Sequence, residues 1–242
     1  YLSNIFLALK ISYANMIAVI CERLKCDAYK IAEALGSDPR IGRKYITPGL
    51  GFGGPCLPRD LGTFMFYLNE LDIDQKLKKE ILKLYRSLLS INKWSIDRVV
   101  ELVSNTAENN LIEISVIGVA YAPGTDDVRN SLSIELIKKL LRRGYLVKIY
   151  DPLEKALVNA KNILGDSVIY CRDLEECADT DIVILATDLS KYDSNYLVNV
   201  FKKVRSRVII DAKGSIYKLK SLFQENNVRI ATIDEILEKI NK

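Results

Sequence analysis

Histidine is missing from all 242 residues of this sequence. Imidazole is the commonest proton-transfer group and metal ligand near neutral pH, so its absence excludes every mechanism that depends on histidine. Any proton transfer by this chain must use a carboxylate, a lysine, a tyrosine, a cysteine or water. We expect no metal site in it.

Paired cysteines are missing too, because the sequence has five cysteines, an odd number, and no paired C-x-x-C spacing. This pattern argues against a disulfide framework and against a zinc site, so we expect reduced thiols and a cytoplasmic protein. Cys21 lies on an apolar helical pattern, and Cys171 and Cys177 flank a short helical segment, so we expect these three in the core.

Long hydrophobic runs are also missing. No stretch approaches the roughly 20 uninterrupted apolar residues of a membrane helix, and the apolar segment 2–24 is broken by Lys10 and Asn15. The net charge of +4 comes from 35 basic and 31 acidic residues spread along the chain. We therefore expect neither a membrane nor a nucleic-acid partner, although an anionic small molecule fits the charge.

Helical periodicity dominates residues 1–107. Apolar residues three or four apart predict a helix over 2–24, and Asp27 is typical of the N-cap of a second helix that ends at Gly36. A pattern without proline or glycine predicts a helix of about 30 residues, roughly 45 Å long, from Gln75 to Asn105. We interpret this region as a helical domain with a connecting or dimerising helix.

Residues 108–242 change to the alternation of a βαβ fold. "LIEISVIGVAY" and "YLVKIYDP" are typical of strands and are separated by the amphipathic segment "SIELIKKLLRRG". "DIVILATD", "RVIIDAKG" and "NNVRIAT" add further strands, and "IDEILEKINK" closes the chain. We predict an α/β protein whose second domain is a doubly wound, Rossmann-like parallel sheet.

The connection after the first strand, "AYAPGTDDVRNS", has one glycine where a dinucleotide fold has G-x-G-x-x-G. Asp151, at the end of the second strand, imitates the acid that binds the ribose of a dinucleotide. With one glycine only, this connection is poorly suited to bind the pyrophosphate of a nicotinamide dinucleotide through its backbone N–H groups. A reductase that holds NAD in residues 108–242 is therefore disfavoured.

Chemistry is concentrated in "GFGGPCLPRD", residues 51–60. Three glycines in four positions allow a left-handed backbone or close approach to a ligand. Cys56 is a candidate nucleophile, Arg59 a candidate to favour its thiolate, and Asp60 a candidate to position or deprotonate water. From residue types alone, an inert loop cysteine beside a surface ion pair remains an open alternative.

Three segments resemble the UDP-glucose/GDP-mannose dehydrogenase family: "LSNIFLALKIS", "GSDPRIGRKYITPGLGFGGPCLPRD" and "SVIGVAYAPGTDDVRNSLSIELIKKLLRRGYLVKIYDP". The resemblance covers essentially the whole chain, as that family's central dimerisation domain and its carboxyl-terminal nucleotide-sugar-binding domain. It implies a homodimer formed through the helical domain. The family's N-terminal NAD-binding domain has no counterpart in this chain, so we expect this chain to be part of a longer enzyme and inactive alone.

The resemblance implies oxidation of the C6 alcohol of a nucleotide sugar, UDP-glucose being favoured, to a carboxylate by two NAD molecules. Cys56 would form a thiohemiacetal and then a thioester that water hydrolyses. Asp60 would hold the water or act as base, and Asn4 would help stabilise the oxyanion at C6. In this interpretation the glycines admit the sugar to the cysteine.

Further roles follow from the resemblance alone. Substrate-binding positions are Arg40, which would reach the nucleotide sugar of the neighbouring subunit, and Tyr45, Phe52, Gly53, Tyr121 and Lys213. Arg129 matches a residue that contacts the cofactor. Ala122 stands where the family has a substrate-contacting lysine, Arg59 replaces the usual lysine, and a lysine preceding Asn4 has no counterpart.

Two alternatives to UDP-glucose oxidation stay open. One is a dehydrogenase for GDP-mannose or UDP-N-acetylmannosamine, although the basic residue before Asp60 favours the UDP-glucose and GDP-mannose branches. The other is a non-catalytic nucleotide-sugar-binding or assembly module with a vestigial Cys56, which Ala122 favours.

Overall fold

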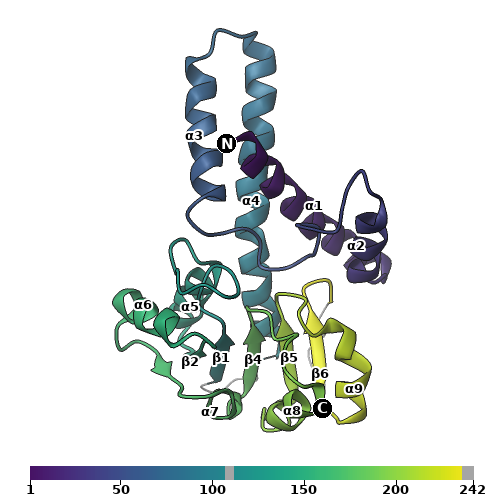
Figure 1. The fold of residues 1–242 in the computed structure, drawn as a ribbon, viewed down its shortest axis with the longest axis vertical. Helices are drawn as coiled ribbons and strands as arrows, with labels where there is room; N and C mark the ends of the chain where they lie inside the picture. The colour runs from purple at the N-terminus through teal and green to yellow at the C-terminus, as the bar shows by residue number, and fades with distance from the viewer. Residues whose placement is uncertain (107–111, 236–242) are drawn as a thin grey trace.

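A computed structural model describes residues 1–106 and 112–235. A helical part stands at one end of the strands of a parallel sheet, and one long helix runs from the tip of the helical part into the core beside the sheet (Figure 1). The α/β class with a Rossmann-like sheet is therefore confirmed. The expected boundary between residues 107 and 108 lies outside the described residues.

The helical part contains four helices within the described residues: α1 (Leu2–Leu24), α2 (Ala28–Ser37), α3 (Leu57–Glu70) and α4 (Gln75–Thr106). Helices α3 and α4 form an antiparallel hairpin that projects away from the sheet (Figure 1). The expected long helix is confirmed with 32 residues. The cysteine loop, defined here as residues 49–56, joins the turns after α2 to the start of α3.

The sheet has the order β3-β2-β1-β4-β5-β6, and every pair of neighbours is parallel. Its elements are β1 (Glu113–Ile117), α5 (Leu132–Arg142), β2 (Leu146–Tyr150), α6 (Glu154–Leu164), β3 (Ile169–Tyr170), α7 (Leu174–Ala178), β4 (Ile182–Leu185), α8 (Ser194–Phe201), β5 (Val208–Asp211), η1 (Tyr217–Leu219), α9 (Lys220–Glu225) and β6 (Arg229–Thr232). The direction of strand order reverses between β1 and β4, which is where sheets of this kind bind ligands.

Two apolar clusters cover the two faces of the sheet. One joins the sheet to α5, α6 and the carboxyl-terminal half of α4, including the fully buried Val99, Leu102 and Val103. The other joins it to α7, α8 and α9, with Phe201 and Phe223 at its centre. Because half of α4 packs on the sheet, the helical part and the sheet share one core and are not separate bodies.

Helix α2 differs from the prediction at its end. Asp27 caps it as expected, accepting from the backbone N–H groups of Tyr29 and Lys30, but the helix continues to Ser37. Gly36 is therefore helical rather than terminal. A Cβ at Gly36 would lie 3.0 Å from Cα of Arg43, so close packing explains the glycine better than a left-handed cap does.

Helix α1 is the one helix among the described residues that is long and apolar enough to cross a membrane by length and composition, with mean hydropathy 1.6. The expectation that no segment would qualify is corrected to this extent. The helix packs on α2, α3 and α4, and Asn15 and Ser12 are buried against them. One side of α1 is therefore a packing face against the other helices.

Candidate active site

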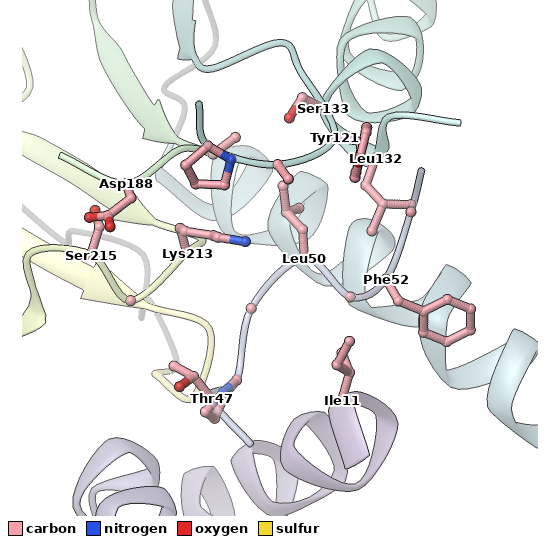
Figure 2. A pocket seen from close by; sticks show the side chains of 18 of the residues that line it. Ile11, Thr47, Leu50, Phe52, Tyr121, Leu132, Ser133, Asp188, Lys213 and Ser215 are labelled. Atoms are coloured by element: carbon pink, nitrogen blue, oxygen red, sulfur yellow. The ribbon is translucent and has the colours of Figure 1, made fainter. Parts of the chain in front are cut away.

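A pocket of about 930 Å³ lies where the cysteine loop meets the carboxyl ends of β1, β4 and β5. One wall is formed by residues 45–57 and the other by the loops that leave those strands. Figure 2 shows Leu50 from the first wall close to Lys213 from the second, with Asp188 on the far side of Lys213. The pocket therefore lies at the reversal of strand order and brings together segments far apart in the sequence.

Cys56 lines this pocket at the start of α3. All five cysteines lie within the described residues, and Cys56 alone among them is exposed. Cys21, Cys171 and Cys177 are buried as expected. Cys56 occupies the N-cap position of α3, where the positive end of the helix dipole favours negative charge. An accessible thiol at such a position is suited to act as a nucleophile.

Asp60 lies one helical turn after Cys56, and its backbone N–H donates to the Cys56 carbonyl at 2.8 Å. Its carboxylate, only 4% exposed, accepts from Asn4 Nδ2 at 2.6 Å and from Arg59 Nε at 3.0 Å. The Asn4 bond, helped by Arg59, holds the pKa of Asp60 below its ordinary value. The three polar residues singled out near Cys56 thus form one connected group with an ionised carboxylate.

The glycines of the cysteine loop have protein neighbours of their own. A Cβ at Gly51 would overlap Asn92 Oδ1, and one at Gly53 would lie 2.5 Å from the Asn130 carbonyl oxygen. A Cβ at Gly54 would lie 2.6 Å from the Tyr121 ring. Close approach of other chain segments therefore already requires glycine at each position, before any sugar is considered.

Phe52 contributes to the pocket through its backbone. Its ring is 2% exposed and packs with Ile5, Ala8, Leu61 and Leu88. Figure 2 shows the ring directed away from Lys213 and Asp188. Gly53, the other position expected beside it, also lines the pocket.

Lys213 provides positive charge on the opposite wall, just after β5. Its side chain is exposed to solvent by accessible area, and partial desolvation by neighbouring residues lowers its pKa, with Asp188 and Asp211 acting in the opposite direction. Asp211 is fully buried and accepts from the backbone N–H groups of Lys213, Ser215 and Ile216. It thereby fixes the turn that presents Lys213.

Tyr45 and Tyr121 line the pocket with exposed rings, 47% and 38% accessible. Tyr45 has a left-handed backbone, φ 63°, which is uncommon for an aromatic residue and holds its ring at the pocket rim. Ala122, beside Tyr121, also lines the pocket. Its methyl group leaves this wall without the cation that the family resemblance leads one to expect.

Arg40 and Arg129 do not line the pocket. Each guanidinium is bound by the carboxylate two residues before it, Asp38 for Arg40 and Asp127 for Arg129. The side chains are 87% and 71% exposed. Both arginines therefore present a partly neutralised cation to solvent, where a group from outside the described residues can reach it.

The connection after β1 does not match the phosphate turn of a dinucleotide fold. Asp151 is 6% exposed, and its carboxylate accepts from the backbone N–H groups of Val119 at 2.8 Å and Leu153 at 2.9 Å. Because these oxygens hold backbone, the carboxylate is not available to a ribose. This turn therefore differs from the G-x-G-x-x-G turn of a dinucleotide fold both in its glycine count and in the way its acid is engaged.

Sequence reasoning missed several residues that build this pocket. Asn92 holds both backbone polar groups of Phe52, and Asn15 accepts from the backbone N–H of Gly49. Ser133, 3% exposed, lines the pocket from the first turn of α5. The sequence offered one signal for these residues: Asn15 is a polar residue inside an otherwise apolar helical face. Asn92 has no such feature in the sequence.

Family models match most of the chain. Residues 1–86 match the central domain of the UDP-glucose/GDP-mannose dehydrogenase family, and residues 115–218 match its UDP binding domain. Each match contains one wall of the pocket, since the first includes Cys56 and the second includes Lys213.

Known proteins agree with these matches. The chain is 35% identical to UDP-glucose 6-dehydrogenase of Rickettsia prowazekii over 88% of this chain and 48% of that protein. It is 35% identical to UDP-glucose 6-dehydrogenase TuaD of Bacillus subtilis over 88% of this chain and 45% of that protein. A solved UDP-glucose dehydrogenase from Pyrobaculum islandicum superposes with a TM-score of 0.79 at 32% identity, covering 98% of this chain and 50% of that one.

The chain therefore spans about half the length of the relatives it matches. With both family models matched in order and the fold shared, this chain belongs to the UDP-glucose/GDP-mannose dehydrogenase family.

Proposed function

We propose that this chain forms the catalytic-cysteine and nucleotide-sugar-binding part of an NAD-dependent nucleotide-sugar 6-dehydrogenase that oxidises UDP-glucose to UDP-glucuronate. The observation that carries the proposal is the accessible thiol of Cys56 on the pocket, one helical turn from the buried, ionised Asp60. Family membership and the UDP-glucose 6-dehydrogenase relatives support the substrate.

In this proposal the C6 alcohol of the sugar first loses a hydride, which NAD accepts when bound, and a proton to become an aldehyde. The thiolate of Cys56 then adds to this aldehyde and forms a thiohemiacetal. Loss of hydride from C6 gives a thioester, and water then releases the carboxylate and regenerates the thiol. Asp60 orients that water and takes its proton, while the amide of Asn4 stabilises negative charge at the C6 oxygen. NAD, when bound, supplies the oxidant for both hydride transfers.

The opposite wall would hold the nucleotide. Lys213 offers a cation for the diphosphate, Tyr121 offers an aromatic surface on the same wall, and Tyr45 offers one from the cysteine-loop wall. Arg129, exposed after β1, is the candidate contact for NAD. Because the β1–α5 turn differs from the turn of a dinucleotide fold, the cofactor's main contacts are assigned to the rest of a complete enzyme.

We also propose a homodimer formed through the helical part. Apolar side chains recur along one side of α1 and are each more than 40% exposed; they are Leu2, Phe6, Tyr13, Met16, Ile20 and Leu24. A second copy covering this stripe would bring Arg40 of one chain toward the substrate of the other. Phe6→Glu combined with Met16→Glu should halve the mass measured by light scattering. The cytoplasmic location stays a prediction.

The test is substrate-dependent NAD reduction by the complete protein carrying Cys56→Ala. The covalent mechanism predicts that the rate falls at least about 10³-fold, because no other nucleophile can form the thioester. Cys26→Ala, at the end of α1, is the control and should retain normal activity. Full NAD reduction by the Cys56→Ala protein would contradict the proposal.

One observation favours a second candidate, a non-catalytic nucleotide-sugar-binding module. Ala122 places a methyl group in the pocket lining where the family resemblance leads one to expect a lysine. This candidate predicts that the unsubstituted complete protein binds UDP-glucose but reduces no NAD, whereas the dehydrogenase must do both.

A further inference from the structure

The cysteine loop is held by backbone hydrogen bonds to asparagines from three different segments. Asn15 lies on α1, Asn92 in the middle of α4, and Asn130 just before α5. They bind Gly49, Phe52 and Gly54 respectively. None of these asparagines was assigned a role by sequence reasoning.

Asn92 makes the strongest attachment. Its Oδ1 accepts from the Phe52 backbone N–H at 2.7 Å, and its Nδ2 donates to the Phe52 carbonyl at 2.8 Å. One side-chain amide therefore satisfies both polar groups of one loop residue, as a neighbouring strand would. The Phe52 ring is anchored separately in the helical core, so this residue is fixed on both its backbone and its side chain.

The position of Asn92 also explains why residue 51 is a glycine. The backbone there has φ +113°, and a Cβ would overlap the same Oδ1 atom that accepts from Phe52. Any other residue would both strain the backbone and push the amide out of register. Glycine at position 51 and asparagine at position 92 thus depend on each other.

The other two asparagines hold the loop on either side of Phe52. Asn15 is fully buried, accepts from Gly49 at 2.9 Å and donates to Ser95 Oγ on α4 at 2.9 Å. The Asn130 carbonyl accepts from the Gly54 N–H at 3.1 Å, and its Nδ2 donates to the Gly54 carbonyl at 3.3 Å. Asn130 has φ 50°, which asparagine tolerates better than most residues.

We propose that Asn15, Asn92 and Asn130 are positioning residues that fix the cysteine loop, so that Cys56 meets a substrate held by the sheet at a defined distance. Asn92 is the principal attachment, and Asn130 links the loop to the wall that carries the nucleotide contacts. The catalytic part of this inference rests on the proposed function, whereas the hydrogen bonds that hold the loop do not depend on it. Misplacement of a nucleophile by about 1 Å can cost about 10²-fold in rate.

Hydrogen exchange of this chain tests the grip without substrate or cofactor. Asn92→Ala should lower the protection of the Phe52 amide by about tenfold or more, because its acceptor is gone. Asn92→Asp keeps an acceptor for that N–H but cannot donate to the Phe52 carbonyl when ionised, so it should retain more Phe52 protection than Asn92→Ala. The matched control is Asn162→Ala, an exposed helical asparagine on α6, which should leave the loop unchanged.

The complete enzyme supplies the second readout. Asn92→Ala and Asn92→Asp should lower kcat by about 10-fold to 100-fold while changing KM for the nucleotide sugar by less than about threefold. If the loop amides exchange at the same rate in Asn92→Ala as in Asn162→Ala, the proposal that Asn92 holds the loop is wrong. If the loop amides exchange faster in Asn92→Ala but kcat is unchanged, the proposed positioning role is wrong. Activity that survives Cys56→Ala would instead overturn the proposed function, leaving the exchange result to stand.

Discussion

The two walls of the pocket are built in different ways. The wall from the helical part carries the reactive thiol on a loop whose backbone is bonded at Gly49, Phe52 and Gly54. The wall from the sheet carries Lys213 and Asp188, together with aromatic and hydroxyl groups that face the cavity. A reaction needs atoms at fixed distances, whereas recognition of an anion needs charge, and each wall provides one of these.

This difference predicts that substitutions on the two walls affect different measurements. Changes around Cys56 should lower the catalytic rate with little change in binding, and changes around Lys213 should weaken binding first.

Asp60→Asn in the complete enzyme should lower kcat by about 10²-fold to 10⁴-fold, because the amide cannot accept a proton from water. The affinity for the nucleotide sugar should change little, since Asp60 is buried beside Asn4 and is not among the residues that line the pocket. Steady-state kinetics and calorimetry measure the two quantities. A loss of affinity comparable to the loss of rate would place Asp60 in substrate recognition instead.

Lys213→Ala should weaken UDP binding by this chain by about 10-fold to 100-fold, the usual effect of removing one charge-assisted hydrogen bond. Lys155→Ala, at an exposed position on α6 that does not line the pocket, is the control and should bind normally. Titration calorimetry with UDP measures both variants. Equal affinity in the two would remove Lys213 from the phosphate site.

The pH dependence of UDP binding also tests the role of Lys213. Burial lowers the pKa of Lys213 from its ordinary value, and a bound diphosphate favours the protonated lysine. UDP should therefore bind with full affinity at pH values below the pKa of Lys213 in the unliganded protein, and its affinity should decline several-fold as the pH rises through that pKa. The decline should begin below the ordinary lysine pKa of about 10.4. Lys213→Arg should keep the affinity and abolish this decline; a decline that persists in the arginine variant would come from another group.

The smallest effect is expected from Asn4→Ala on Asp60 itself. Loss of the Asn4 hydrogen bond should raise the pKa of the Asp60 carboxyl toward its ordinary value. The stabilisation that this lowered pKa provides is present above the unfolded-state pKa and is lost as pH falls through the folded-state value. Carboxyl NMR titration of both proteins measures the shift. An unchanged pKa would leave Arg59 as the dominant partner.

Much of the fold could be predicted from the sequence, because periodicity reports which side chains must be buried. The long α4, the parallel strands and the capping by Asp27 all follow from local patterns. The shared apolar cluster could not be predicted, because local periodicity gives the length of α4 but not that its carboxyl-terminal half packs on the sheet.

The site shows the same limit. Cys56 and Asp60 stand together in one short segment, and the family resemblance added Asn4 and Lys213 from far along the chain. The purpose of Gly51 and the role of Asn92 could not be inferred, since 41 positions separate them and only the fold brings the amide onto the loop backbone. Phe52 was expected at the pocket, where its backbone lies, but an isolated sequence does not show that its ring turns into the core.

Thermal unfolding of this chain with UDP, UDP-glucose, GDP and NAD tests the central claim most directly, because it asks what the sheet wall recognises without requiring turnover. A ligand at about 100 times its dissociation constant adds roughly 2.7 kcal/mol of stability, which moves a melting temperature by several degrees. The account predicts stabilisation by UDP and UDP-glucose that is lost in Lys213→Ala, with no effect of NAD. Stabilisation by NAD alone would contradict it and would make the sheet a cofactor domain.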